Sequence, residues 1–125
     1  MIPGRNADHP RFFESFKYAI QGFLTAITTE RNINVQLFLG FLTLILGAFL
    51  KLDFISWCIV LICFGLVIFA ELCNTAMETI VDLACPEIHP LAKRAKDIAA
   101  ASVLVLSCTA ALVGLIVFAR ALGVF

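Results

Sequence analysis

The stretch that decides the fold is ELCNTAMETIVD, residues 71–82. It follows the uncharged run 54–70 and introduces three carboxylates and one amide, which belong to Glu71, Asn74, Glu78 and Asp82. On an α-helix, with about 100° per residue, these four side chains lie on one stripe about 16 Å long. Like charges on one stripe repel each other. The pattern therefore indicates a helix whose acidic stripe faces something cationic: a metal ion, a lysine cluster or both.

The composition indicates a membrane protein. Of 125 residues, 62% are hydrophobic, and the mean hydropathy is +1.02. Soluble domains are only about 45–50% apolar. Nine basic and nine acidic residues balance to a net charge of zero, which argues against a nucleic-acid partner because such a partner requires a basic face. The five cysteines are scattered without a C-x-x-C pair, so they indicate neither a zinc site nor a disulfide framework.

Hydrophobic periodicity predicts an all-α membrane protein of one domain, with a surface helix followed by three membrane spans. Residues 10–29 alternate apolar and polar faces at helical spacing and are too polar to cross a bilayer, so they predict an amphipathic helix lying on the membrane. The predicted spans cover residues 33–50, 54–84 and 97–120. The second is longer than about 30 Å of hydrocarbon requires. We therefore expect the acidic stripe to lie where this span leaves the membrane.

The positions of lysine and arginine predict the orientation. The segment before the first span and the loop 85–97 are rich in basic residues, whereas the turn between the first two spans has only Lys51. The positive-inside rule places the N-terminus and the loop 85–97 in the cytoplasm and the C-terminus outside. The surface helix, Glu30, the acidic stripe and the basic loop should then meet at the cytoplasmic surface of the membrane.

Such a meeting point suits phosphoryl transfer. The carboxylates of Glu30, Glu78 and Asp82 are candidate ligands for Mg²⁺, and the basic loop is a candidate phosphate site. Glu71, one turn deeper toward hydrocarbon, is placed to take a proton from a lipid hydroxyl. The chain has no Walker A loop, G-x-G-x-x-G or H-R-D motif, so ATP would be used without a standard nucleotide fold.

The residues alone leave alternatives open. A proton- or cation-coupled transporter also uses acids within the membrane, and a structural oligomer would use the stripe only for packing. Asp82 could pair with Lys93 or Arg94, and Asp97 could be only the N-cap of the third span. His89 could be loop structure, and Arg11 and Tyr18 could be headgroup anchors.

Two segments carry a family resemblance. They are Glu71-x-x-Asn74-Thr75-Ala76-x-Glu78-x-x-Val81-Asp82 and His89-Pro90-Leu91-Ala92-Lys93-x-Ala95-Lys96-Asp97-x-Ala99-Ala100-Ala101. The chain resembles the prokaryotic diacylglycerol kinases, a family that includes the undecaprenol kinases, over about residues 11 to 120. The resemblance implies a homotrimer of three-span chains in the bacterial inner membrane. Its sites would be shared between neighbouring chains and would take ATP and Mg²⁺ from the cytosol and a lipid alcohol from the membrane.

The same resemblance implies roles by position. Glu71 matches the catalytic base, Glu30 and Glu78 match the carboxylates that hold divalent ions on the ATP phosphates, and Asn74 helps to place them. Lys96 would contact the phosphates and Asp97 would orient it or bind the nucleotide, while Asp82 has a supporting role. The remaining candidate nucleotide contacts are Arg11, Tyr18, Glu87 and His89.

The lipid substrate is less sharply indicated. Glu30-Arg31-Asn32, with polar residues at 34 and 36, resembles the branch that prefers undecaprenol more than the branch that prefers diacylglycerol. The undecaprenol-preferring branch usually has a basic residue near 34 and a histidine near 36, where this chain has Asn34 and Gln36. We expect undecaprenol or diacylglycerol as the substrate, with undecaprenol favoured.

Overall fold

The computed structural model describes residues 12–125, and these fold into four helices without a strand. The helices are α1 (Phe12–Thr29), α2 (Arg31–Phe49), α3 (Phe54–Ala84) and α4 (Pro90–Ala121). This confirms the predicted all-α fold. α2, α3 and α4 are long and apolar enough to cross a membrane, as predicted for the three spans.

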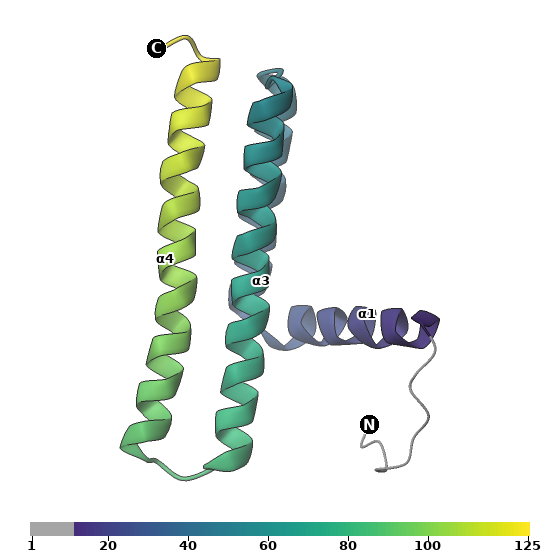
Figure 1. The fold of residues 1–125 in the computed structure, drawn as a ribbon, viewed down its shortest axis with the longest axis vertical. Coiled ribbons are helices and arrows are strands. Elements are labelled where there is room, and N and C mark those ends of the chain that lie inside the picture. The colour runs from purple at the N-terminus through teal and green to yellow at the C-terminus, as the bar shows by residue number, and fades with distance from the viewer. Residues whose placement is uncertain (1–11) are drawn as a thin grey trace.

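The helices form a narrow bundle with one helix set apart. α3 and α4 run antiparallel side by side, α2 lies behind α3, and α1 projects nearly at right angles to them (Figure 1). The apolar face of α1 carries exposed side chains, including Phe12, Phe16 and Ile20. A helix that projects at right angles to the spanning helices and has an exposed apolar face suits a position in the membrane interface.

The bundle encloses little interior. One small cluster of Leu52, Val60 and Val117 closes the end near the α2–α3 turn, with Trp57 packed against it. Most large apolar side chains of the three long helices are exposed instead. Such surfaces are stable in hydrocarbon or against other helices, and they would be unfavourable in water.

The α2–α3 turn lies at the same end of the bundle as the C-terminus (Figure 1). Lys51 has a left-handed backbone, with φ of 52°, and the Ser56 hydroxyl donates to Asp53 Oδ1 at 2.5 Å. This hydrogen bond, helped by the charge of Arg120, holds the pKa of Asp53 below its ordinary value. The turn was predicted from Lys51-Leu52-Asp53, and the helices on either side confirm it.

Two helix starts differ from the prediction. α2 begins at Arg31 rather than at residue 33. α4 begins at Pro90, two turns before the predicted start at Asp97. The early start of α4 has a local cause, because proline suits the first turn of a helix and His89 Nδ1 caps that turn by accepting from the Leu91 amide at 3.2 Å. Asp97 therefore lies inside α4, and the suggestion that it caps the helix is wrong.

Candidate active site

The site begins at the corner between α1 and α2. Glu30 is the single residue between the two helices, with extended backbone angles of φ −113° and ψ 118°. The Asn34 side chain fixes this corner by donating to the carbonyl oxygens of Ile27 at 2.7 Å and of Glu30 at 3.1 Å. Ile33 beside it is fully buried, with an exposed fraction of 0%. The corner therefore holds Glu30 at the side of the bundle.

Two polar side chains of the acidic stripe are buried on α3. Glu71 is 4% exposed and Asn74 is 8% exposed. The charges of Glu30 and Glu78 both lie within electrostatic range of the Glu71 carboxylate. Asn74 Nδ2 donates to Glu78 Oε1 at 3.0 Å. Glu71, Asn74, Glu78 and Glu30 thus lie near one another in the structure.

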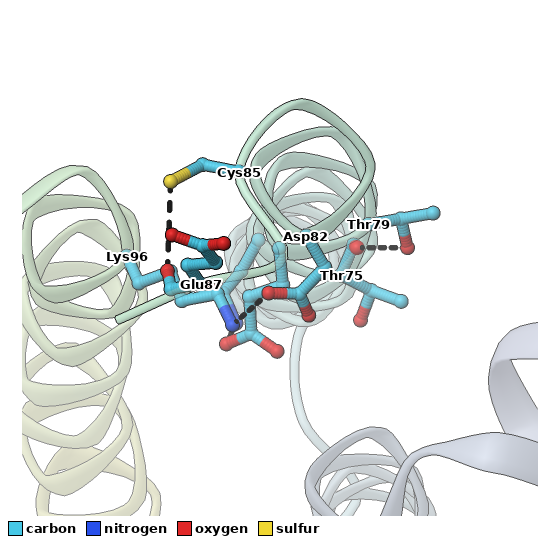
Figure 2. A network of polar contacts seen from close by, with 8 residues as sticks. Thr75, Thr79, Asp82, Cys85, Glu87 and Lys96 are labelled. Carbon is cyan, nitrogen blue, oxygen red and sulfur yellow. Dashed lines mark hydrogen bonds and ion pairs between the residues drawn. The ribbon is translucent and has the colours of Figure 1, made fainter. Parts of the chain in front are cut away.

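A salt bridge ties the acidic stripe to α4. Lys96 Nζ lies 2.5 Å from Asp82 Oδ1 (Figure 2), and the charge of Glu78 also acts on this lysine. The suggestion that Asp82 pairs with Lys93 or Arg94 is therefore wrong in its partner. Lys93 instead pairs with Asp97 one turn along the same helix.

Other predicted nucleotide contacts lie farther out or make only local bonds. Tyr18 is exposed on α1. The carbonyl of Glu87 accepts from the Cys85 thiol at 3.5 Å (Figure 2), and His89 caps α4, so both residues have a structural role in the α3–α4 loop. Arg11 lies outside the described residues.

The donor set suits Mg²⁺ only together with a nucleotide. Between residues 12 and 125, no group of three or more His, Cys, Asp or Glu side chains is placed to hold a metal ion. Glu30 and Glu78 supply hard oxygen ligands, and Asn74 Oδ1 is buried without a hydrogen-bond partner in the same part of the chain. Mg²⁺ is commonly held by one or two carboxylates plus substrate phosphates. The residues therefore fit a metal that arrives with its phosphates.

One polar contact was missed by the sequence reasoning. Gln36 Nε2 on α2 donates to Ser107 Oγ on α4 at 3.1 Å. The available signal was a glutamine and a serine inside otherwise apolar spans, since polar side chains are rare there without a partner or a function.

Comparison with known proteins decides the family. The sequence profile of prokaryotic diacylglycerol kinase matches residues 17–118. The chain belongs to the prokaryotic diacylglycerol kinase family. Undecaprenol kinase of Bacillus subtilis (strain 168) is 40% identical over 108 residues, which cover 86% of this chain and 88% of that protein.

Other members of the prokaryotic diacylglycerol kinase family are similar over nearly the same region. Diacylglycerol kinase of Synechocystis sp. (strain PCC 6803) is 38% identical over 106 residues, covering 84% of this chain and 61% of that protein. Diacylglycerol kinase of Helicobacter pylori (strain 26695) is 33% identical over 104 residues, covering 83% of this chain and 81% of that protein.

As a member of the prokaryotic diacylglycerol kinase family, the chain is a lipid kinase and an integral membrane protein. The resemblance read from residues 71–82 and 89–101 is thereby confirmed. Family membership therefore favours the lipid kinase over the two alternatives that the residues alone leave open, a transporter and a purely structural oligomer.

Proposed function

We propose that this lipid kinase transfers the γ-phosphate of ATP to the hydroxyl group of a membrane lipid alcohol, in a reaction that requires Mg²⁺. The observation that carries the proposal is the buried carboxylate of Glu71, held one turn from the hydrogen-bonded pair of Asn74 and Glu78. The buried carboxylate of Glu71 can accept a proton, while the polar and charged side chains beside it are placed to hold the metal ion and the phosphates.

Each proton and bond in the transfer has a place. Glu71 accepts the proton of the lipid hydroxyl while the lipid oxygen bonds to the γ-phosphorus. The bond from that phosphorus to the oxygen bridging to the β-phosphate breaks, and its electron pair leaves with ADP. The products are ADP and the lipid phosphate. Such a transfer depends mainly on positioning and on stabilising charge.

The phosphates would lie against the outer part of the acidic stripe. Glu30 and Glu78 would hold Mg²⁺, which when bound offsets the negative charge of the phosphate oxygens. Lys96 would contact the phosphates, and its salt bridge with Asp82 supports this by keeping the ammonium group at the stripe. The further nucleotide contacts proposed from the sequence are Arg11, Tyr18, Glu87, His89 and Asp97.

Undecaprenol is the favoured lipid and diacylglycerol is the alternative. The support is the polar pattern at residues 30–36 together with a relative, 40% identical, that is named undecaprenol kinase. A relative named diacylglycerol kinase is nearly as similar, at 38% identity. Both lipids offer a primary hydroxyl near the membrane surface, so the substrate is a matter for direct assay.

We further propose a homotrimer in the bacterial inner membrane, with the N-terminus and the α3–α4 loop in the cytoplasm. The basic residues around α1 and in the segment from Lys93 to Lys96 support this orientation. The small enclosed core and the exposed apolar faces of the long helices support association with other chains.

The test is a phosphate-transfer assay with purified protein, radiolabelled ATP, Mg²⁺ and either undecaprenol or dioleoylglycerol. We expect labelled lipid with at least one of them and faster labelling of undecaprenol. Glu71→Gln should reduce kcat by about 10²–10⁴-fold, the usual contribution of a general base. Asp53→Asn, the same carboxylate-to-amide change at the opposite end of the bundle, is the matched control. Absence of labelled lipid with both substrates would overturn the proposal.

A further inference from the structure

A cavity between the three membrane-spanning helices has one polar end and an apolar body. Its volume is about 580 Å³, within the range of pockets that hold small molecules. Gln36 of α2 and Ser107 of α4 both line it and share a hydrogen bond of 3.1 Å. Thr43 also lines it, but its hydroxyl donates to the Leu39 carbonyl of its own helix at 2.8 Å. The lining therefore matches a molecule with one polar group and a hydrocarbon chain.

The polar end of the cavity lies beside the proposed base. On α3 the wall is formed by residues at helical spacing, including Val60, Phe64 and Val67. Glu71 continues this series, one turn or about 6 Å beyond Val67 on the same face of the helix. Gln36 lies near the start of α2, at the corner with α1. A hydroxyl group at the polar end is thus within a helical turn of the level of Glu71.

The length of the cavity suits the chain of a lipid. Gln36 and Leu46 both line it, and their separation on a helix corresponds to about 15 Å, the thickness of about half the hydrocarbon core. Phe118 lines the far end and packs against the small buried cluster near the α2–α3 turn. Leu42 and Leu115 also line the cavity and are 52% and 69% exposed, so its side is open to the surrounding hydrocarbon.

We propose that this cavity holds the first part of the hydrocarbon chain of the lipid substrate, with the hydroxyl at the polar end and the rest of the chain in the bilayer. The inference rests on the proposed kinase reaction. Gly114 is the residue that keeps the cavity wide. It lines the cavity, and a Cβ atom added to it would meet no atom within 4 Å. The space beside it is therefore free for the chain, including the methyl branches of a polyprenol.

The first test fills the cavity at this glycine. Gly114→Leu should lower kcat/KM for the lipid by about 10–100-fold, because the added side chain and the lipid chain compete for the same space. The KM for ATP should stay unchanged. Gly65→Leu is the matched control, since a Cβ atom there also meets no atom within 4 Å and Gly65 does not line the cavity. If Gly114→Leu does not fold, Gly114→Ala should give a two- to fivefold loss, the effect of about one methyl group.

The second test varies the length of the lipid. On α4, Gly114 lies two helical turns beyond Ser107, about 10 Å deeper, and the chains of dibutyrylglycerol are too short to reach it. The ratio of kcat/KM for dioleoylglycerol to that for dibutyrylglycerol should fall about tenfold in Gly114→Leu and keep the parental value in Gly65→Leu. A substitution that merely disturbed the bundle would lower both constants equally.

The outcomes separate this inference from the proposed function. Parental kcat/KM for the long lipid in Gly114→Leu, or an unchanged ratio between the long and short lipids, would overturn the chain site and leave the kinase reaction intact. Reduced association of the chains in Gly114→Leu, measured by light scattering and absent from Gly65→Leu, would assign the cavity to a neighbouring chain instead. No phosphorylation of any lipid by the parent enzyme would overturn the kinase reaction and the chain site together.

Discussion

At the scale of single residues, Asn74 uses its two polar atoms differently. Its amide nitrogen donates to Glu78, while its buried oxygen has no hydrogen-bond partner within residues 12–125. A buried acceptor without a partner is costly. In the proposed reaction, a hydroxyl group or a water molecule would donate a hydrogen bond to this oxygen. Asn74 would then orient Glu78 through its nitrogen and accept a hydrogen bond through its oxygen when the substrates bind.

Glu78→Gln tests the metal assignment. The amide keeps the shape of the side chain but loses the negative charge that attracts a divalent cation. We expect the Mg²⁺ concentration for half-maximal activity to rise by about tenfold, measured by titrating Mg²⁺ at fixed ATP. Asp53→Asn at the far end of the bundle is the control. An unchanged Mg²⁺ dependence in Glu78→Gln would show that this carboxylate is not a ligand.

Asp82→Asn tests whether the salt bridge to Lys96 serves the nucleotide. The pair is partly exposed, with side-chain exposures of 36% for Lys96 and 63% for Asp82, and such pairs contribute at most about 1 kcal/mol. The KM for ATP should therefore rise only about two- to fivefold, in a steady-state assay at low salt.

Asp53→Asn provides the control for that comparison. It makes the same carboxylate-to-amide change in the α2–α3 turn, at the opposite end of the bundle. The KM for ATP should stay near the parental value in Asp53→Asn. Equal increases in the two variants would mean that Asp82 contributes only general surface charge.

At the scale of helices, α2 and α3 approach closely at a glycine. A Cβ atom added at Gly40 would collide with the ring of Phe64, whereas a Cβ at Gly65 would meet no atom within 4 Å. We expect Gly40→Ala to lower the free energy of unfolding by about 1–3 kcal/mol because the ring must move. Gly65→Ala should leave it unchanged or raise it by up to about 1 kcal/mol, since alanine favours helix more than glycine.

Unfolding in mixed detergent micelles, titrated with a denaturing detergent, would measure both variants. Equal stabilities for Gly40→Ala and Gly65→Ala would mean that Phe64 moves aside at no cost. The Phe64 ring and Gly40 both line the cavity. Equal stabilities would therefore mean that the ring moves into this cavity.

Helical periodicity and length predicted the elements well but not all of their ends. The apolar runs were enough to place three spans, and Lys51-Leu52-Asp53 was enough to place a turn. The start of α4 was missed because Lys93, Arg94 and Lys96 were taken as a polar loop. Lysine and arginine are good helix formers, and a capped proline start extends the helix through them.

The candidate site was predictable in residue detail where it lies along one helix. The spacing of Glu71, Asn74 and Glu78 fixes a shared stripe on α3, and their proximity follows from helix geometry. The hydrogen bond of Gln36 to Ser107 joins residues 71 positions apart in the chain. It depends on how α2 and α4 lean on α3, and no local pattern encodes that. The same holds for the choice of Lys96 as the partner of Asp82.

At the scale of the whole molecule, the candidate residues from Glu30 to Lys96 already approach one another within a single chain. In the proposed trimer, a neighbouring chain would cover the open side of this site. We expect the active species in mild detergent to be a trimer, measured by light scattering on chromatographic fractions that are also assayed for lipid phosphorylation. Full specific activity in a strictly monomeric fraction would contradict the shared site.

The long helices reach well past the hydrocarbon core. α3 has 31 residues and α4 has 32, lengths of about 45–50 Å against a core of about 30 Å. α1 projects sideways from the bundle at a level above the α3–α4 loop (Figure 1). If α1 lies at the interface, the segments of α3 and α4 beyond it, with Asp82 and Lys96, extend into the cytosol where ATP is dissolved.

The corner at Glu30 would make the geometry of the site depend on the thickness of the bilayer. One extended residue joins the two helices. In the proposed membrane placement, α1 lies among the headgroups, whereas the position of α2 depends on the thickness of the hydrocarbon. We expect a thinner or thicker membrane to change the tilt of α2 and so its angle to α1, and Glu30 is the residue that joins the two helices. We expect turnover in vesicles of graded acyl length to pass through a maximum, and Asn34→Ala, which loosens the corner, to flatten it.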